Sequence, residues 1–149
     1  MTVYTESRLV PAPANLLFSL VADVERYPEF LPMWKWARIR RWEGPSTYYT
    51  AQNVGFGPIR ERFETKTVLE PPESIVVTSS DPLFREFYIH WTFAEVPEGC
   101  QIGIQLKWQA HSFLLQKAID MVLPKTAEMM VDAFETRVQD ILRAADQRS

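Results

Sequence analysis

Residues 20–42 read Leu-Val-Ala-Asp-Val-Glu-Arg-Tyr-Pro-Glu-Phe-Leu-Pro-Met-Trp-Lys-Trp-Ala-Arg-Ile-Arg-Arg-Trp. A short helical pattern leads into an aromatic turn with two prolines, and the chain leaves that turn as a strand. The turn carries Phe30, Leu31 and Trp34, which is more apolar area than a solvated loop needs. We therefore expect residues 27–34 to cover a core or a ligand cavity.

The bulk composition predicts one globular domain over residues 1–149. The chain is 46% hydrophobic and 13% aromatic, and its net charge of −3 argues against a DNA-binding or other general nucleic-acid-binding protein. A single cysteine, Cys100, excludes an internal disulfide and fits a reducing compartment. No apolar run reaches the ~20 residues of a membrane span, and the N-terminus lacks the pattern of a signal peptide. We expect a soluble intracellular protein.

The hydrophobic period changes along the chain from extended to helical, then to strands and back to helical. The pattern predicts a short extended segment, a helix over 14–21 and a short turn that Asp23 caps and that ends before Pro28. A final helix over 112–145 contains Pro124, which should kink or split it. The predicted strands are 3–10, 35–43, 47–56, 59–69, 74–80, 86–96 and 101–110, separated by turns such as Gly57-Pro58.

Two of these strands alternate clearly enough to assign their faces. In 101–110 the even-numbered residues from Ile102 to Ala110 are apolar, and in 59–69 the odd-numbered residues include Phe63. One dry face and one wet face are typical of an antiparallel sheet covered on a single side. The amphipathic helix after Pro124 is the element that can cover it, so we expect an α+β domain.

The residues that could carry chemistry are few. Neither His90 nor His111 has a partner at metal-ligand spacing, so no metal site is predicted, and Cys100 lies in no nucleophile motif. Glu61 shares the dry parity of Phe63, where a carboxylate is costly without a partner. Its structural interpretation is an ion pair or a place at the water-facing end of the sheet. Its functional interpretation is a contact to a ligand headgroup, or a general acid or base.

Basic residues alternate with tryptophans over 34–42. Lys35, Arg38, Arg40 and Arg41 could protect a strand edge, bind single-stranded nucleic acid, or anchor the protein on an anionic membrane. Among the functional alternatives we favour the membrane surface, because residues 30–33 could insert into lipid.

Three blocks of the sequence resemble the coenzyme Q-binding proteins of the polyketide cyclase/START superfamily, which also contains a bacterial ribosome-association toxin. The first is Val10–Pro32, with Asp-Val-Glu-Arg-Tyr-Pro-Glu-Phe-Leu-Pro at 23–32. The second is Asp81-Pro82-Leu83-Phe84 followed by Trp91-Thr92-Phe93, and the third is Met130–Arg137 in the C-terminal helix. The blocks stand in the family's order and extend the resemblance over essentially the whole chain.

The resemblance implies a helix-grip fold of the START/Bet v 1 type, in which a curved antiparallel sheet of about seven strands wraps a long C-terminal helix and leaves an apolar tunnel. It implies non-enzymatic binding and delivery of ubiquinone or a related polyprenyl lipid in support of respiration, with no cofactor besides this ligand. The expected place is a bacterial cytoplasm, peripheral to the inner membrane. Alternatives are docking on the large ribosomal subunit through Arg38, Arg40 and Arg41, and an aromatase or cyclase that uses Glu61.

The turn, the dry faces and the C-terminal helix together supply the expected ligand contacts. They are Phe30, Leu31, Trp34, Trp36, Glu61, Phe63, Trp91, Trp108, Met130 and Phe134.

Overall fold

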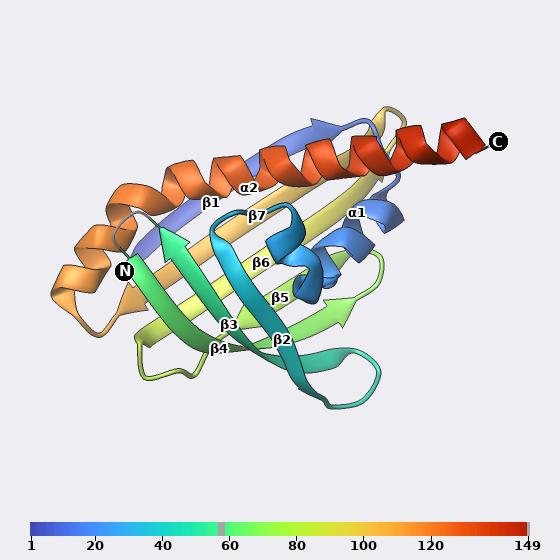
Figure 1. The fold of residues 1–149 in the computed structure, drawn as a ribbon. Helices are drawn as coiled ribbons and strands as arrows, with labels where there is room; N and C mark the ends of the chain where they lie inside the picture. Colours follow the sequence, from blue (N-terminus) through green and yellow to red (C-terminus); the bar gives the residue numbers. More distant parts are fainter. Residues whose placement is uncertain (57–58, 149) are drawn as a thin grey trace.

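The computed structural model describes residues 1–56 and 59–148, and the Gly57-Pro58 turn lies outside them. A seven-stranded antiparallel sheet curves around one long helix, α2 (Phe113–Arg148) (Figure 1). The strands are β1 (Thr2–Val10), β2 (Trp34–Trp42), β3 (Thr47–Phe56), β4 (Ile59–Glu70), β5 (Ser74–Thr78), β6 (Phe84–Val96) and β7 (Gly99–Ala110). The expected α+β helix-grip architecture is confirmed.

The strand order is β1-β7-β6-β5-β4-β3-β2, so consecutive strands from β2 to β7 are neighbours and β1 closes the sheet beside β7. Period-two alternation fixes the register, because a slip of one residue would turn the apolar side chains to solvent. β7 alternates buried and half-buried residues along its whole length, and the even-numbered residues face α2 as predicted. In β4 the odd-numbered Phe63, Thr65 and Thr67 are buried while their neighbours are exposed.

Helix α2 lies across the concave face of the sheet and buries a stripe at three- and four-residue spacing. Ala127, Val131, Phe134 and Val138 are at most 2% exposed. Pro124 does not split the helix, although the first turns of α2, in orange in Figure 1, run at an angle to the rest. The bend follows from the backbone N–H that proline lacks.

Two short helical elements close one end of the sheet. α1 (Ala14–Ala22) packs against α2, β6 and β7, and the 3-10 turn η1 (Val24–Glu29) packs against β2. The expected turn forms, but it includes Pro28 instead of ending before it. Asp23 makes no side-chain capping bond and instead pairs with Arg26 at 3.1 Å. The tighter 3-10 geometry accommodates proline because its fixed φ suits a short turn.

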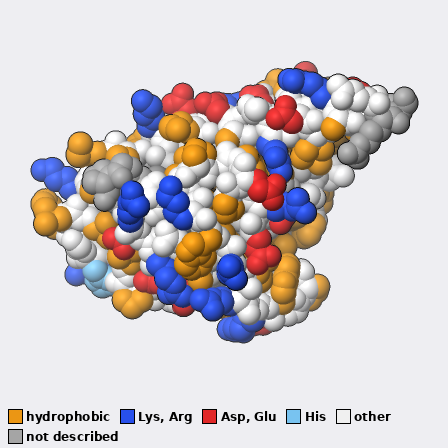
Figure 2. Space-filling view, viewed as in Figure 1, with side chains coloured by type: hydrophobic (Ala, Val, Ile, Leu, Met, Phe, Trp, Pro, Cys, Tyr) orange, Lys and Arg blue, Asp and Glu red, His pale blue; other side chains and the backbone are white. Residues whose placement is uncertain are grey.

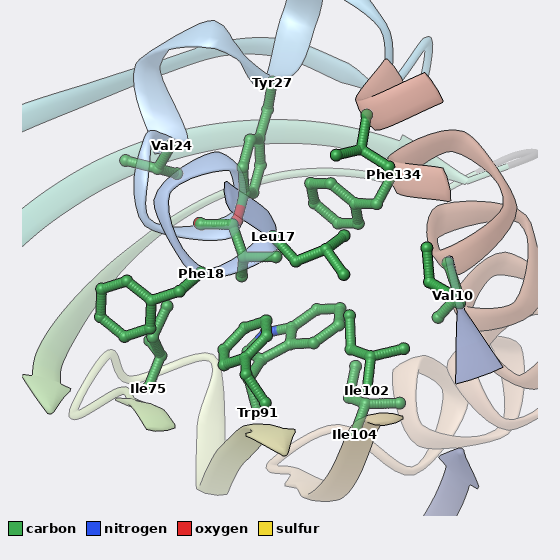
Figure 3. Close-up of a cluster of buried hydrophobic side chains, with 14 of the residues drawn as sticks. Val10, Leu17, Phe18, Val24, Tyr27, Ile75, Trp91, Ile102, Ile104 and Phe134 are labelled. Atoms are coloured by element: carbon green, nitrogen blue, oxygen red, sulfur yellow. The ribbon is translucent and has the colours of Figure 1, made fainter. Parts of the chain in front are cut away.

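The densest part of the core lies where η1, α2 and the sheet meet. Figure 3 shows Phe134 and Tyr27 above Trp91, with Leu17 between them. The ring centroid of Phe134 lies 5.5 Å from that of Tyr27, 5.3 Å from Phe30 and 5.6 Å from Trp91, all edge-to-face. Such pairs stabilise by about 0.5–1.5 kcal/mol each beyond their buried area, so Phe134 joins helix, turn and sheet.

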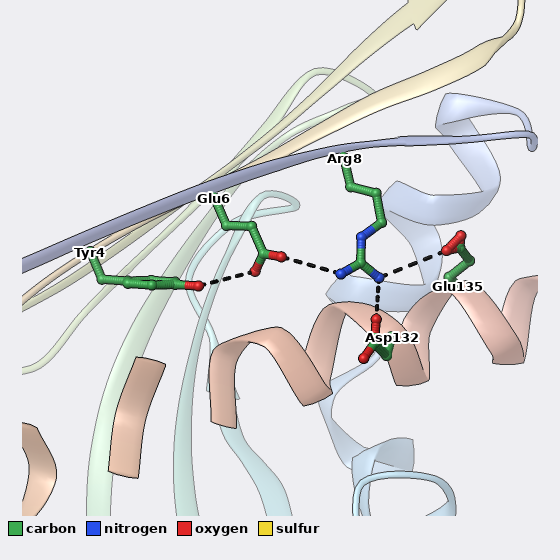
Figure 4. Close-up of polar contacts among 5 residues, drawn as sticks. All are labelled: Tyr4, Glu6, Arg8, Asp132 and Glu135. Atoms are coloured by element: carbon green, nitrogen blue, oxygen red, sulfur yellow. Dashed lines mark hydrogen bonds and ion pairs between the residues drawn. The ribbon is translucent and has the colours of Figure 1, made fainter. Parts of the chain in front are cut away.

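A charged network fastens the edge strand β1 to α2 (Figure 4). The Arg8 guanidinium donates to Asp132, donates to Glu6 at 3.2 Å and lies 3.7 Å from Glu135. Burial alone would lower the pKa of Arg8, but the hydrogen bond to Asp132 and the neighbouring carboxylates raise it. Arg8 thus balances a group of acidic side chains and holds β1 beside the helix.

Candidate functional site

An apolar cavity lies between the concave face of the sheet, α2 and η1. It encloses about 1180 Å³ of space free of atoms, its open mouth included. Most of its lining is aliphatic or aromatic, with contributions from α1, η1, α2 and strands β2 to β7. This lining favours an apolar ligand, because few polar groups on the wall would hold water there.

Six of the ten expected contact residues line this cavity. They are Trp34, Glu61, Phe63, Trp91, Trp108 and Met130. The structure brings them together from β2, β4, β6, β7 and α2. Their contact with a ligand remains a prediction.

The other four expected residues lie elsewhere. Phe134 and Leu31 are fully buried packing residues at 0% exposure. Leu31 and Phe30 border a second, shallower groove between η1 and α2, where the Arg137 guanidinium lies 5.2 Å from the Phe30 ring centre. Trp36 misses the cavity because a bulge between Trp34 and Trp36 shifts the register of β2. The shift turns Trp36 to the outer face, where Arg62 lies 6.0 Å from its ring centre.

The apolar turn at 27–34 covers the cavity and packs part of its apolar surface against the core. Tyr27 and Trp34 line the cavity, as expected of a covering segment. Leu31 is 0% exposed, and Phe30 and Met33 pack against the core. Of residues 30–33, whose composition predicts lipid insertion, Leu31 is held in the core, Phe30 and Met33 are half-buried and Pro32 is exposed. Membrane contact of this turn stays a prediction.

A buried polar cluster interrupts the apolar lining on β3 and β4. The Trp34 indole N–H donates to the Gln52 side-chain oxygen at 2.8 Å. The Gln52 amide nitrogen donates to Thr50 at 3.0 Å and Thr65 at 3.2 Å, and the two threonine hydroxyls lie 2.5 Å apart. Gln52 and Thr65 line the cavity. A ligand oxygen that reached this place would meet N–H and O–H donors on an otherwise dry wall.

Sequence reasoning missed Gln52 and Thr50. Both lie on the inward parity of β3, which pairs Thr50 with Thr65 and Gln52 with Phe63. The sequence does carry an indication of them, because polar residues occupy even-numbered positions of 47–56, next to the strand 59–69 whose inward face can be assigned. Only the register between the strands shows that these residues meet.

Two buried tyrosines form the wall near α1. The Tyr48 hydroxyl donates to the Ala22 carbonyl at 2.9 Å, and the Tyr27 hydroxyl donates to the Val21 carbonyl. Burial raises the pKa of Tyr48 to about 12 and raises that of Tyr27 well above its ordinary value. Both phenols therefore stay neutral near pH 7 and cannot serve as general bases.

Glu61 lines the cavity and keeps part of its surface in solvent. It forms no ion pair within residues 1–56 and 59–148, so of its two structural interpretations the structure favours the water-facing end of the sheet. Across those residues, no three His, Cys, Asp or Glu side chains cluster as metal ligands do. Cys100 is fully buried, and burial raises the pKa of its thiol.

Three phenylalanines close a seam in the sheet. β5 ends at Thr78, so the first half of β4 and the start of β6 have no strand between them. Phe63 lies 5.9 Å from Phe84 and 5.7 Å from Phe87, and the last two are 4.9 Å apart. All three line the cavity. The seam follows from the shortness of β5.

The outer face of β2–β4 is basic, as Figure 2 shows over the front of the molecule. Cross-strand pairing aligns Arg41, Tyr49 and Lys66 in one row, and Arg41 lies 3.9 Å from the Tyr49 ring centre. Neighbouring rows add Arg38 and Arg62, all exposed. Arg41 also pairs with Glu43 at 3.5 Å and Arg62 with Glu64 at 3.8 Å, so cations exceed carboxylates on this face but do not stand alone.

The comparisons with known proteins agree with this geometry. Over residues 10–135 the chain matches the family described as polyketide cyclase / dehydrase and lipid transport. It is 34% identical over 136 residues to the ribosome association toxin RatA of Pseudomonas aeruginosa, which covers 91% of this chain and 94% of the relative. It is 32% identical over 136 residues to the mitochondrial coenzyme Q-binding protein coq10 of Schizosaccharomyces pombe, covering 88% and 83%.

Among solved structures, an aromatase/cyclase from Streptomyces superposes with a TM-score of 0.86 at 16% identity and 97% coverage of both chains, a likeness of fold alone. Among the described residues, no helix is both long and apolar enough to cross a bilayer. The match over residues 10–135, with relatives above 30% identity along nearly the whole chain, shows that this protein belongs to the polyketide cyclase / dehydrase and lipid transport family.

Proposed function

We propose that this protein binds ubiquinone or a related polyprenyl lipid in its cavity and delivers it, without catalysis, in support of respiratory electron transport. The observation that carries the proposal is the cavity itself, a dry enclosure with one polar cluster on its wall. The likeness to a coenzyme Q-binding protein supports the choice of ligand. We place this activity in a bacterial cytoplasm, at the inner face of the membrane.

The lining suits a ligand with a long apolar tail and a small head that accepts hydrogen bonds. Quinone carbonyls are acceptors, and the cluster offers the Trp34 indole N–H, the Gln52 amide and the Thr65 hydroxyl as donors. A ligand carbonyl could replace one of the internal acceptors without leaving a buried donor unpaired. Tail burial at ~25 cal/mol per Å² would supply the affinity.

Organic extraction of the purified protein followed by mass spectrometry tests the proposal. A polyprenyl quinone in stoichiometric amount is the expected result. If the extract is empty, the protein is incubated with quinone-loaded vesicles, re-isolated and extracted again. An empty second extract would overturn the proposal.

A variant pair tests where the ligand lies. Ala127 is fully buried and lines the cavity, whereas Ala133 lies two turns along the same helix beside the shallower groove. Ala127→Phe should fill the cavity and abolish quenching of tryptophan fluorescence by added quinone. Ala133→Phe, the matched control, should quench as the unaltered protein does. Equal quenching in a folded Ala127→Phe variant would contradict the assignment.

An aromatase or cyclase role through Glu61 is less well supported. The other acidic groups of the lining are tyrosines, and the two with raised pKa values stay protonated at neutral pH. Neither histidine lines the cavity. We expect no turnover of a polyketide mimic, and turnover that Glu61→Gln abolishes would show an enzyme.

A second candidate function is association with the large ribosomal subunit, favoured by the basic outer face of β2–β4 and by likeness to a ribosome association toxin. The expected contacts include Arg38, Arg40 and Arg41, all exposed. Co-sedimentation with large subunits at moderate salt should disappear in an Arg40→Glu/Arg41→Glu variant. It should persist in Arg143→Glu, which reverses an exposed charge on α2. Loss in both variants would indicate unspecific charge attraction.

A further inference from the structure

The first turns of α2 carry an apolar face that the fold leaves uncovered. Phe113 is 79% exposed, Leu114 77% and Met121 78%. At 3.6 residues per turn these three side chains project to the same side of the helix. Large apolar side chains that are exposed together mark an interaction surface more often than chance placement does.

Two lysines lie on the same side of the helix as these apolar residues. Lys117 stands one turn after Phe113 and Lys125 one turn after Met121, and both are exposed. Neither pairs with a carboxylate in the described part of the chain. Asp120, three residues after Lys117, accepts hydrogen bonds from Thr2 and Trp108 on the sheet side, and the exposed Glu128 lies three residues after Lys125. Figure 2 shows apolar and basic side chains intermixed at this end of the molecule.

The same end of the molecule holds the open side of the cavity. Most lining residues from α1 and β3 are buried, whereas those that keep solvent exposure include Leu83, Phe84, Ile119 and Leu123. The last two belong to the first half of α2, on the flank opposite the exposed face. His111 N–H donates to the Leu83 carbonyl at 3.2 Å and so ties the start of α2 to the start of β6.

We propose that Phe113, Leu114 and Met121, with Lys117 and Lys125, form the surface by which this protein docks on an anionic lipid bilayer, with its cavity mouth beside the membrane. The inference rests on the proposed lipid-carrier function, which gives the docking its biological purpose. The surface itself is argued from the exposed residues of α2 and not from the cavity. Apolar side chains that reach below the headgroups, flanked by lysines that remain among them, are the composition of an interfacial helix.

Charge complementarity selects a bilayer over a second copy of this chain. A symmetric dimer would place the same face on both sides of the interface. The two lysines of one copy would then lie near those of the other and repel them, whereas anionic headgroups attract lysines. The docking surface also differs from the turn at 30–33, where Leu31 is buried and Phe30 and Met33 pack against the core.

Flotation with vesicles free of quinone tests the surface separately from the cavity. The unaltered protein should bind vesicles of equal parts phosphatidylcholine and phosphatidylglycerol and bind phosphatidylcholine alone more weakly. Phe113→Glu/Leu114→Glu should lower binding by at least ~10-fold, because two apolar side chains lose their burial in lipid. Lys117→Glu/Lys125→Glu should remove the preference for phosphatidylglycerol. Since all four side chains are exposed, circular dichroism and unfolding should be unchanged.

Two controls share the chemistry of the variants but not their position. Trp42→Glu changes a 52% exposed aromatic residue on the β2 edge, and Arg38→Glu/Arg62→Glu reverses charge on the outer sheet face. Both should float as the unaltered protein does. Loss of flotation in these controls with retention in Phe113→Glu/Leu114→Glu would overturn the proposal and move the membrane contact to β2.

Three further outcomes are distinguishable. A protein that takes up a short-chain quinone in solution but never floats would refute the docking surface and leave the carrier function standing. A protein that floats through α2 but takes up no quinone would refute the carrier function alone. If light scattering shows a dimer that Phe113→Glu/Leu114→Glu converts to a monomer, the face is a self-interface and the proposal fails.

Discussion

Phe134 offers a quantitative test of how the turn, the helix and the sheet are held together. Its ring is fully buried and makes edge-to-face contacts with Tyr27, Phe30 and Trp91 at 5.3–5.6 Å. Phe134→Leu keeps an apolar side chain in the core but removes all three ring pairs. At about 0.5–1.5 kcal/mol per aromatic pair, we expect the free energy of unfolding to fall by about 2–4 kcal/mol.

The assay is urea unfolding followed by tryptophan fluorescence, with thermal unfolding alongside. A chain of this size loses about 2–4 °C of Tm per kcal/mol, so Tm should fall by roughly 4–16 °C. Phe18→Leu is the matched control, because Phe18 is also buried but makes one ring contact, with Phe93 at 5.6 Å, among the described residues. Equal losses in the two variants would refute the view that ring contacts, and not burial alone, hold the turn on the helix.

Three other substitutions test single features. Arg8→Ala should cost about 0.5–1 kcal/mol of stability, and less at high salt, because the Asp132 side chain is 58% exposed and regains water when the guanidinium is lost. Urea unfolding at two salt concentrations measures the loss, and an unchanged midpoint would contradict the role of Arg8 in holding β1 on α2. Burial raises the pKa of folded Tyr48 to about 12 from an ordinary 10.0. The stability that this shift contributes is complete below pH ~10 and is lost as the pH rises towards ~12. The free energy of unfolding should therefore decline less steeply with pH in Tyr48→Phe, and parallel curves for the two proteins would argue against the raised pKa. Gly99→Ala should destabilise by several kcal/mol, since φ is +141° and a Cβ would lie 2.2 Å from the Val10 carbonyl oxygen; a Tm within ~1 °C of the unaltered protein would refute that close approach.

The strands and helices of this fold could be predicted from the sequence because each rests on a local period. Alternation over 101–110 and 59–69 assigns the inward faces of β7 and β4, and the structure buries those residues. The three- and four-residue spacing after Pro124 likewise predicts the buried stripe of α2. The ends of elements expected at prolines could not be predicted in this way, because Pro28 lies inside η1 and Pro124 inside α2. A proline restricts the backbone, but packing around it decides whether an element ends there.

Some residues of the candidate site could be predicted from strand alternation and others could not. Trp91, Trp108 and Phe63 lie on strands whose alternation of apolar and polar residues shows which side chains point inward, and all three line the cavity. Trp36 could not be placed in this way, since a bulge after Trp34 reverses the faces of the residues that follow, up to a second register shift between Ile39 and Arg41. The helical spacing predicts that Phe134 points inward, but it does not tell a cavity wall from a packed core. Its contacts with the rings of Tyr27 and Trp91 show that it is a packing residue.

The amino-acid sequence by itself determined which elements form, which faces are dry and to which family the chain is similar, because these depend on residues close together in the chain. The tertiary structure decided the polar cluster of Gln52, Thr50 and Thr65, the seam closed by phenylalanines, and the uncovered face of α2. Each of these depends on strand register and on how far a helix extends past the sheet. Strand register and the extent of the helix are set by the free energy of the whole fold, so a pattern of neighbouring residues does not predict them.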